Sequence, residues 1–345
     1  MQELISVSES RKCLLLAELL RTDGFVSGQQ LCGRFGISRT AVWKMISQLA
    51  EEGYEVESVP RKGYRLVACP DVIRPELVGA YLLNRYEGRM EEGRAGSFLR
   101  YYDVTGSTNN DAKRLAEEGA PSGTLVAADC QQAGKGRRGR TWSNPAGTNI
   151  AMSLLLRPDI QPVHASMLTL VMGMAAARAC KEAAPSLQIM IKWPNDIVCE
   201  GKKLSGILTE MSSEVDCINY VVVGIGINAN LESFPDEISS TASSLKLLTG
   251  KNICRAELTA SVMYWFEQYY GVFLKTQDLS GLMDEYNSLL AGKNDRVRVL
   301  DPNGEFTGIS EGINRRGELL VKTEDGTVSE IYAGEVSVRG IYGYT

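Results

Sequence analysis

The residues best suited to chemistry lie in a short loop that is rich in glycine and in positive charge. Residues 131–140 read Gln-Gln-Ala-Gly-Lys-Gly-Arg-Arg-Gly-Arg, so four cations and three glycines are interleaved. Like charges crowded into one loop repel one another unless an anion lies among them. Arginine offers phosphate a rigid fork of donors, and glycine lets the backbone close on a ligand. The loop therefore predicts an anion site, with Trp142 beyond it to stack on a base. A solvated basic loop and a second nucleic-acid patch are the alternatives.

Known nucleotide-binding motifs do not explain this loop. Gly134, Gly136 and Gly139 satisfy Gly-x-Gly-x-x-Gly, but the dinucleotide-binding motif needs a helix that opens within the glycines. Here the chain is predicted to continue into a strand over 149–156. None of the Gly-Lys pairs has a glycine five residues earlier or a Ser or Thr after it, so the sequence contains no Walker A loop.

Two further polar clusters accompany the loop. Residues 107–109, Ser-Thr-Asn, precede a helix predicted over 111–118, where the ordinary role of such residues is to cap the helix. Lys192 ends an apolar strand predicted over 187–191, and Pro194 prevents that strand from continuing. A single lysine at the end of a strand is usually solvated, so neither cluster identifies a site by itself.

Metal-dependent and hydrolytic sites have little support in the sequence. The eight cysteines are never closer than 18 residues and His164 is the only histidine, so no zinc site and no protein-held metal is predicted. A Gly-x-Ser-x-Gly pattern at 308–312 lies in a predicted turn, not between a strand and a helix. With one histidine as the only candidate base, a serine hydrolase is not favoured.

The first seventy residues predict a winged helix-turn-helix. Helical periodicity covers 11–20, a short helix covers 29–35 before a glycine, and a third covers 40–52 with Ser38 as its N-cap. Alternating residues on both sides of a basic turn at 60–63 predict a β-hairpin wing. A small helical interaction module is the alternative.

The placement of cations favours DNA as the partner of this segment. Its net charge is a poor guide, because residues 1–70 hold nine Lys or Arg against eight Asp or Glu. The outer face of the second motif helix and the tip of the wing are, however, where phosphates and base edges are contacted. The predicted DNA-binding residues are Arg39, Thr40, Lys44, Arg61 and Lys62.

Five segments resemble, in the same order, the biotin–protein ligases of the two-function class, which also act as the biotin operon repressor. They are residues 107–109, 131–140, 192–196 (Lys-Trp-Pro-Asn-Asp), 203–208 and 224–228. The resemblance covers almost the whole chain, winged helix included. One departure is Lys135, where the commonest family pattern has Arg; the charge is kept, but the bidentate fork is lost.

The resemblance implies an enzyme that joins biotin to ATP and passes biotin from biotinyl-5′-AMP to a lysine of a biotin carboxyl carrier protein. It implies Mg²⁺ bound with ATP, operator DNA as a second partner, and a homodimer promoted by biotinyl-AMP. The implied catalytic residues are Lys192 and Arg137. The implied biotin-binding residues are Ser107, Thr108, Asn109, Gln131, Lys135, Gly136, Arg137, Lys192 and Gly206. The implied ATP- or adenylate-binding residues are Arg138, Arg140, Trp142, Asn195, Gly226 and Asn228. Asp196 is interpreted as a turn residue rather than a metal contact.

Length and periodicity predict an α+β chain with several domains. At roughly 100–200 residues per domain, 345 residues suit two or three. Long amphipathic helices over 165–184 and 255–275 alternate with strands and with a hairpin that turns at 200–201. The resemblance implies the mixed sheet of class II tRNA synthetases and biotin ligases. Short strands from residue 295 onward predict a small β-barrel, SH3-like by resemblance. The expected domains are 1–70 (winged helix-turn-helix), 71–292 (ligase) and 293–345 (SH3-like).

Composition predicts a cytoplasmic protein without a membrane span, and two other functions compete with the biotin ligase. The longest apolar stretch, 167–177, is shorter than the ~20 residues that a membrane span needs, and the dispersed cysteines favour free thiols in the cytoplasm. A regulator that senses biotin without catalysis is one rival, disfavoured by the intact Arg137 and Lys192. A lipoate–protein ligase is another, disfavoured by the winged helix and by the 134–140 loop.

Overall fold

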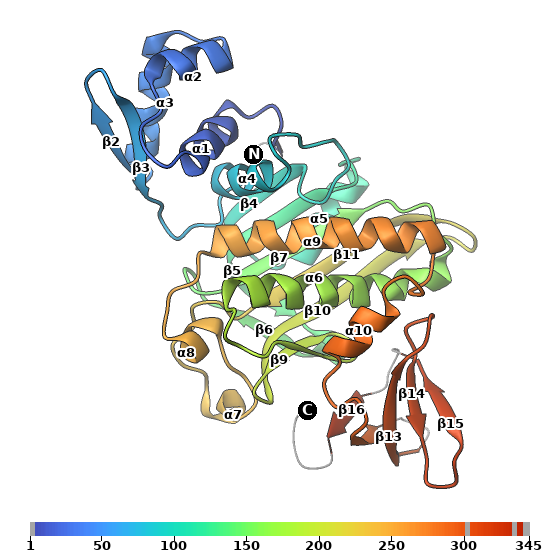
Figure 1. The fold of residues 1–345 in the computed structure, drawn as a ribbon. Helices are drawn as coiled ribbons and strands as arrows, with labels where there is room; N and C mark the ends of the chain where they lie inside the picture. The colour runs from blue at the N-terminus through green and yellow to red at the C-terminus, as the bar shows by residue number, and fades with distance from the viewer. Residues whose placement is uncertain (1–3, 301–303, 333–336, 341–345) are drawn as a thin grey trace.

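The computed structural model describes residues 4–300, 304–332 and 337–340. Three sheets occur along the chain: a two-stranded hairpin near the N-terminus, a nine-stranded central sheet, and a five-stranded sheet toward the C-terminus (Figure 1). Helices precede the hairpin and flank the central sheet. This combination agrees with the predicted α+β class.

A helix-turn-helix with a hairpin wing forms the N-terminal part, as predicted. Gly36 ends the second helix in the left-handed conformation, which glycine adopts at little cost. Ser38 caps the third helix by accepting a backbone hydrogen bond at 3.2 Å. Val42, Ile46 and Leu49 bury the inner face of that helix. The elements are α1 (Arg11–Arg21), α2 (Gly28–Phe35), α3 (Arg39–Glu51), β2 (Glu55–Val59) and β3 (Gly63–Ala68).

The central sheet is mixed, with the strand order β1-β4-β5-β7-β11-β10-β9-β8 and with β6 paired to β5. Strands β4 and β5 are parallel, and the other neighbours are antiparallel. The strands are β1 (Ile5–Ser6), β4 (Phe98–Thr105), β5 (Thr124–Lys135), β6 (Thr141–Asn144), β7 (Ile150–Leu156), β8 (Met190–Lys192), β9 (Asp196–Cys199), β10 (Lys202–Ser213) and β11 (Ile218–Ile227).

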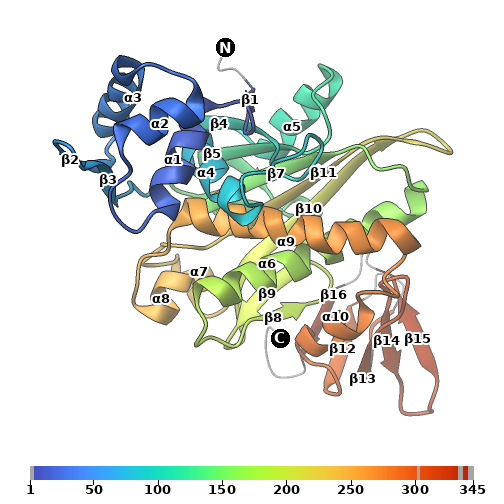
Figure 2. The ribbon, with the colours of Figure 1, turned by 45° about the horizontal axis from the view of Figure 1, so that its top comes forward.

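Helices cover both faces of this sheet. α6 (Leu168–Ala183) and α9 (Arg255–Thr276) run side by side over one face, while α5 (Thr108–Glu117) packs on the other (Figures 1 and 2). α4 (Pro75–Arg85) lies between α1 and α9 and so joins the N-terminal unit to the main core. The remaining helices are α7 (Asp236–Ser239), α8 (Leu245–Thr249) and α10 (Met283–Leu289).

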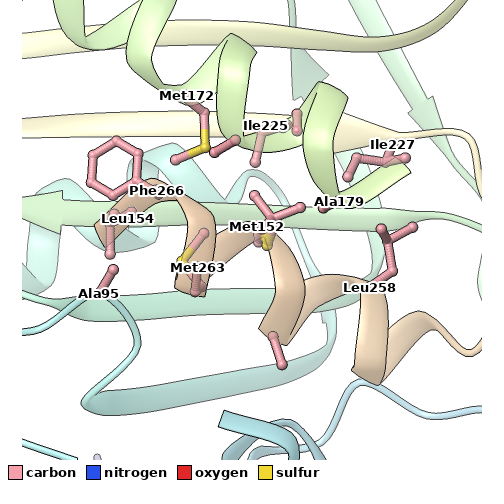
Figure 3. Packing of buried hydrophobic residues seen from close by; sticks show 14 of the residues in the cluster. Ala95, Met152, Leu154, Met172, Ala179, Ile225, Ile227, Leu258, Met263 and Phe266 are labelled. Atoms are coloured by element: carbon pink, nitrogen blue, oxygen red, sulfur yellow. The ribbon is translucent and has the colours of Figure 1, made fainter. Parts of the chain in front are cut away.

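Strand β7 separates two cores because its side chains alternate between the two faces. Met152 and Leu154 face the main core under α6 and α9, where Ile225 of β11 joins them (Figure 3). Leu155 belongs to the smaller core under α5. Ser153, which is fully buried, interrupts the apolar run on the α5 side. A strand covered on both faces is expected to be apolar throughout, so this serine needs a separate explanation.

One helical segment among the described residues, Pro162–Ala183, is long and apolar enough to pass a compositional test for crossing a membrane. However, 72% of its most apolar window is buried inside the protein, where α6 packs between the sheet and α9. It is a core helix. Its first part, Pro162–Met167, is a 3-10 segment, so the regular helix starts at Leu168, later than the expected residue 165.

Three other predicted boundaries also differ from the structure. α5 begins at Thr108 rather than at residue 111. The apolar run 187–191 forms a strand only from Met190, where pairing with β9 begins. The first part of the basic loop, predicted as irregular, continues strand β5 to Lys135, because β6 pairs with it.

The C-terminal unit is an antiparallel sheet with the order β15-β14-β13-β12-β16. Its edge strands β15 and β16 are not paired with each other in the described residues, so the predicted barrel is present as a sheet and not as a closed barrel. The sequence Pro-Asn-Gly at 302–304 also predicts a turn, but Pro302 and Asn303 lie outside the described residues. The strands are β12 (Arg296–Leu300), β13 (Phe306–Ile313), β14 (Leu319–Lys322), β15 (Val328–Ile331) and β16 (Ser337–Gly340).

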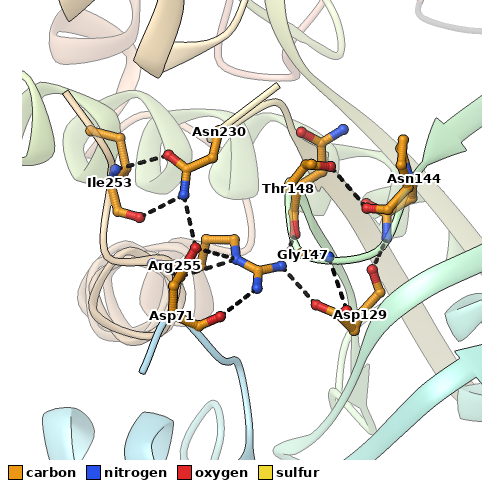
Figure 4. A network of polar contacts seen from close by, with 10 residues as sticks. Asp71, Asp129, Asn144, Gly147, Thr148, Asn230, Ile253 and Arg255 are labelled. Atoms are coloured by element: carbon orange, nitrogen blue, oxygen red, sulfur yellow. Dashed lines mark hydrogen bonds and ion pairs between the residues drawn. The ribbon is translucent and has the colours of Figure 1, made fainter. Parts of the chain in front are cut away.

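A buried arginine ties the segment behind the wing to the central sheet. Arg255, the first residue of α9, is 1% exposed. Its guanidinium contacts the carboxylates of Asp71 at 3.1 Å and Asp129 at 2.8 Å, and donates to the carbonyl of Asn149 at 3.1 Å (Figure 4). Asn230 also donates to Asp71, at 3.0 Å. Four separate stretches of chain therefore meet at one charge.

Replacing this arginine should destabilise the protein markedly. Arg255→Met leaves two carboxylates without their buried partner, so we expect the free energy of unfolding to fall by about 3 kcal/mol. The matched control is Arg316→Met, since Arg316 forms an ion pair with Glu330 at 2.6 Å on the surface; it should cost about 0–1 kcal/mol. Urea unfolding followed by tryptophan fluorescence measures both. Equal losses in the two variants would contradict a structural role for the Arg255 network.

Candidate functional site

A hollow of about 470 Å³, here called the first hollow, lies among α5, β5, β10 and β11. It brings together most of the residues predicted to bind biotin. These are Ser107, Thr108, Asn109, Gln131, Lys135, Gly136, Arg137 and Gly206.

Ser153 organises the neutral part of this hollow. Its Oγ lies 2.6 Å from Oδ1 of Asn109 and 2.8 Å from Oγ1 of Thr108. Gln131 Oε1 accepts hydrogen bonds from the backbone N–H and the hydroxyl of Thr108, at 2.8 and 3.0 Å. The buried serine in β7 therefore serves the site. It holds these side chains in place without a ligand.

The interpretation of residues 107–109 as helix caps is wrong. Ser107 occupies the N-cap position of α5 but makes no capping hydrogen bond with its side chain. Thr108 and Asn109 lie inside the first turn, are buried, and direct their side chains to β5, β7 and β10. The side chains of Thr108 and Asn109 therefore make tertiary contacts rather than capping hydrogen bonds.

Two glycines of β11 leave the space that the hollow needs. A Cβ at Gly224 would lie 2.0 Å from Oδ1 of Asn109, and one at Gly226 would lie 2.3 Å from Cε2 of Trp142. Any larger residue would displace those side chains. Gly226 was expected to allow close approach of a ligand, and in the structure the group that approaches it is the indole of Trp142.

Glu210 of β10 holds the Asn109 amide from the other side. Its carboxylate accepts hydrogen bonds from Nδ2 of Asn109 and from Nζ of Lys113, both at 2.8 Å. Burial by itself raises the pKa of Glu210, but these hydrogen bonds outweigh it and hold the pKa below its usual value. Glu210 is therefore an anionic anchor behind the hollow.

A second hollow, of about 760 Å³, adjoins the first and has a charged lining. It includes the predicted ATP-side residues Arg138, Arg140, Trp142 and Asn195, together with Lys192. The two hollows share a wall, because five residues line both. These are Gly136, Arg137, Trp142, Asn195 and Lys203.

The basic loop has a defined backbone. Arg138 takes the left-handed conformation with φ 56°, and the N–H of Gly136 donates to the carbonyl of Arg140 at 2.7 Å. Arg137 Nη1 donates to Oδ1 of Asn195 at 2.9 Å. Burial lowers the pKa of Arg137; Asp196 opposes this effect, and the neighbouring arginines add to it. A partly desolvated guanidinium among other cations favours an anionic ligand.

Lys192 lies at the end of β8, as predicted, and on the second hollow. The next residue, Trp193, is buried and donates its indole N–H to the carbonyl of Gly317 at 2.9 Å. Val338 of β16 also lines the second hollow. The C-terminal sheet is therefore attached beside the charged part of the site.

Two further predicted residues lie outside the first hollow. Asn228, the residue after β11, is buried; it donates to the carbonyl of Ser243 at 3.1 Å and lies 3.3 Å from the amide of Asn149. It is not among the described residues that line either hollow, so its ATP contact stays a prediction. The interpretation of Asp196 as a turn residue is wrong: it is the first residue of β9, and its carboxylate lies 2.6 Å from Nζ of Lys203.

Sequence reasoning missed Ser153, Glu210 and Lys203. A single serine inside the apolar run 150–156 was an available signal for the first. Glu210 and Lys203 lie on β10, and only strand pairing and the packing of α5 bring them to the hollows. No spacing pattern along the chain announces such contacts.

The five residues predicted to bind DNA are all exposed. Arg39, Thr40 and Lys44 lie on α3, and Arg61 and Lys62 lie in the turn between β2 and β3. These elements project from the N-terminal unit (Figure 1). The structure therefore leaves the predicted recognition helix and wing open to a partner.

The Glu210 anchor gives a pH-dependent prediction. Because the pKa of Glu210 in the folded protein lies below its usual value of 4.5, its stabilisation is present above that value and is lost as pH falls through the folded-state pKa. The loss in free energy of unfolding caused by Glu210→Gln should be largest near neutral pH and shrink as the pH drops below about 4.5. Urea unfolding across this pH range measures it. Glu214→Gln, in the exposed turn of the same hairpin, is the control; a pH-independent Glu210 effect would contradict the prediction.

Comparison with known proteins identifies the parts of the chain. Residues 11–65 match an HTH domain, residues 101–228 match the biotin/lipoate A/B protein ligase family, and residues 294–339 match the biotin protein ligase C-terminal domain.

Whole-length relatives agree with these matches. The bifunctional ligase/repressor BirA of Bacillus subtilis is 42% identical over 329 residues, covering 94% of this chain and 97% of that protein. Its counterpart from Escherichia coli is 31% identical over 94% of this chain and 97% of that protein. The biotin protein ligase from Aquifex aeolicus, solved in complex with biotin and ATP, has a TM-score of 0.62 and 32% identity, and covers 70% of this chain and 98% of that one. With a helix-turn-helix at one end and two adjoining hollows in a ligase fold, this chain belongs to the family of bifunctional biotin–protein ligases and biotin operon repressors.

Proposed function

We propose that this chain is an ATP-dependent biotin–protein ligase that also represses the transcription of biotin genes. It forms biotinyl-5′-AMP and pyrophosphate, then passes biotin to a lysine of a biotin carboxyl carrier protein. The observation that supports this best is the wall shared by the two hollows: the neutral side chains of Ser107, Thr108, Asn109 and Gln131 line the first hollow, and the cations Arg138, Arg140 and Lys192 line the second. A ureido ring and a triphosphate need those two linings next to each other.

In this proposal, the protein positions two anions and stabilises the charge that develops between them. The biotin carboxylate attacks the α-phosphorus of ATP, and pyrophosphate leaves. Arg137 on the shared wall and Lys192 on the second hollow offset the repulsion and stabilise the transition state. Trp142 stacks on the adenine. No protein nucleophile is required, because the lysine of the carrier protein attacks the adenylate.

Mg²⁺ enters the proposal with ATP. Among the residues that the structure describes, no group of three or more His, Cys, Asp or Glu is arranged to hold a metal ion. Mg²⁺ commonly keeps several waters and bridges the substrate's phosphates. Its charge would add to that of the loop cations.

Two other functions compete with this one. The match over residues 101–228 covers both biotin and lipoate ligases, so it does not separate them. The C-terminal match over 294–339 is to a biotin protein ligase domain, which favours biotin. A sensor without catalysis would not need Arg137 and Lys192 at the site.

Adenylation provides the direct test. Arg137→Ala or Lys192→Ala should lower the rate of biotinyl-AMP formation at saturating substrates by about 100-fold or more, because each removes a cation from the reacting phosphoryl group. The assay combines protein, labelled ATP, biotin or lipoate, and an apo carrier domain. Arg114→Ala, an exposed arginine of α5, is the control. Unchanged rates would remove these residues from the mechanism, and labelling with lipoate instead of biotin would favour the lipoate ligase.

We further propose that biotinyl-AMP is the corepressor and acts by promoting a homodimer. One winged helix with a net charge of +1 neutralises few phosphates and should bind DNA weakly. Two such domains in one dimer engage two half-sites together. The adenylate supplies negative charge to the loop at 135–140, so that ligand binding and dimerisation reinforce each other.

Removal of the recognition-helix cations should weaken operator binding. Arg39→Ala with Lys44→Ala should reduce affinity by about 10- to 100-fold and lower its salt dependence. The probe is a DNA duplex that the unaltered protein selects from a random pool. Its fluorescence anisotropy, measured with biotin and ATP present, gives the affinity of each variant. Lys246→Ala on α8 is the control. These substitutions are preferable to deleting residues 1–66, which would also remove β1 and α1 from their packing on β4 and α4. Equal affinity of variant and control would refute this interface, and a first-order dependence on protein concentration would contradict the dimer.

We also propose the boundaries of the three domains and the class of the C-terminal one. Domain boundaries at 70/71 and 292/293 are supported by the wing ending at Ala68 and by β12 starting at Arg296. The antiparallel C-terminal sheet is taken as an SH3-like unit, which is supported by its short strands and by the match over 294–339.

A further inference from the structure

Lys203 lines both hollows, although the sequence predicted no role for it in binding or catalysis. Among the described residues, two cations line both hollows: Arg137 and Lys203. Lys135 lines the first hollow only. Lys192 lines the second hollow only. In the proposed reaction the biotin carboxylate and the α-phosphate meet where the hollows join, and Lys203 lines that junction.

The backbone around Lys203 is held in place from outside the sheet. Its N–H donates to the carbonyl of Thr241 at 2.8 Å, and its carbonyl accepts from the N–H of Ser243 at 3.0 Å. Lys202, the preceding residue of β10, points to the opposite face because side chains alternate along a strand. The direction of the Lys203 side chain is therefore set by the fold.

The contacts of the Lys203 side chain lie within the site. Its Nζ is 2.6 Å from a carboxylate oxygen of Asp196 and 5.8 Å from the centre of a ring of Trp142. A Cβ at Gly206 would lie 2.9 Å from the same Nζ, so this glycine leaves room for the ammonium. Lys203 is 26% exposed at its side chain. The ammonium is therefore partly desolvated and packed between a carboxylate and an indole.

The balance of charge explains what Asp196 does there. The described residues that line the second hollow include the cations Arg137, Arg138, Arg140, Lys192 and Lys203, and Asp196 is the carboxylate among them. Without substrate, this carboxylate offsets part of the positive charge. A triphosphate brings several negative charges and can take over that role.

We propose that Lys203 is a third cation of the adenylation step, which contacts the oxygens at the junction of the biotin carboxylate and the α-phosphate, with Asp196 as its positioning counter-ion. This inference rests on the proposed ligase function. In the step, a carboxylate oxygen forms the bond to phosphorus, and the bond from phosphorus to the β-bridging oxygen breaks. Lys203 donates hydrogen bonds to the oxygens that gain charge, and transfers no proton.

A purely structural role is the competing explanation. In that case Lys203 would only neutralise Asp196, and its loss would act by leaving a carboxylate unpaired. The two explanations differ once Asp196 is made neutral. In an Asp196→Asn background no such carboxylate remains, so a structural lysine becomes dispensable while a catalytic one does not.

The experiment is a double-mutant cycle on the full chain, using biotin-dependent exchange of labelled pyrophosphate into ATP. Adding Lys203→Met to the Asp196→Asn variant should lower kcat by a further ~100-fold, with a smaller change in KM for biotin. Lys203→Arg should keep more activity than Lys203→Met, because it keeps the charge. Lys202→Met is the matched control and should exchange like the unaltered protein. Thermal melting of each variant checks folding.

The inference is overturned if Lys203→Met has no further effect on kcat in the Asp196→Asn background, or if it matches Lys202→Met. Failure of the proposed function itself gives a different result. In that case the unaltered protein shows no biotin-dependent exchange of pyrophosphate. That result refutes the ligase function and, with it, the role of Lys203.

Discussion

The guanidinium of Arg255 connects the parts of this chain that have to act together. From the first turn of α9 it reaches Asp71, in the segment behind the wing, and Asp129 in β5. Asp129 also accepts the backbone N–H of Gly147 at 2.9 Å, in the turn that follows β6. Gln131 and the basic loop lie between these two anchored points. Removing one partner of a buried ion pair lowers the free energy of unfolding by several kcal/mol. These contacts therefore hold the sheet, the two ends of the loop and the segment behind the wing in one arrangement.

The site depends on two glycines, which have no side chain, as much as on the polar side chains around them. Gly224 and Gly226 of β11 make room for the Asn109 amide and for the Trp142 indole. The space lets polar groups from α5 and an aromatic ring from β6 lie directly on the sheet. Ser153 and Glu210 then fix the Asn109 amide from two sides. Protein contacts thus hold the neutral polar groups of the first hollow in place, which reduces the ordering entropy that ligand binding must overcome.

The second hollow is different, because most of its charged side chains are cations. Its cations repel one another, and burial lowers the pKa of Arg137, so this lining favours an anionic ligand. Asp196 offsets part of this charge through Lys203. An anionic ligand relieves the rest. In the proposed function one ligand is both the intermediate of the reaction and the signal, and the negative charge of the adenylate offsets the repulsion within the loop.

The sequence alone determined the local features and the family. Caps at Ser38 and Gly36, the alternation around the basic turn, and the glycine-arginine loop are written in neighbouring residues, because caps, turns and charge clusters act over a few positions. The segment 107–109 and the Lys192 strand end were also found, though the first was open to a capping interpretation. Tertiary structure decided what these residues touch. It placed Asp196 in a strand against Lys203, paired the Asn228 amide with the carbonyl of Ser243, and brought Ser153 and Glu210 to the first hollow. Contacts between strands far apart in sequence depend on pairing register and on packing across the sheet, and no local pattern encodes them.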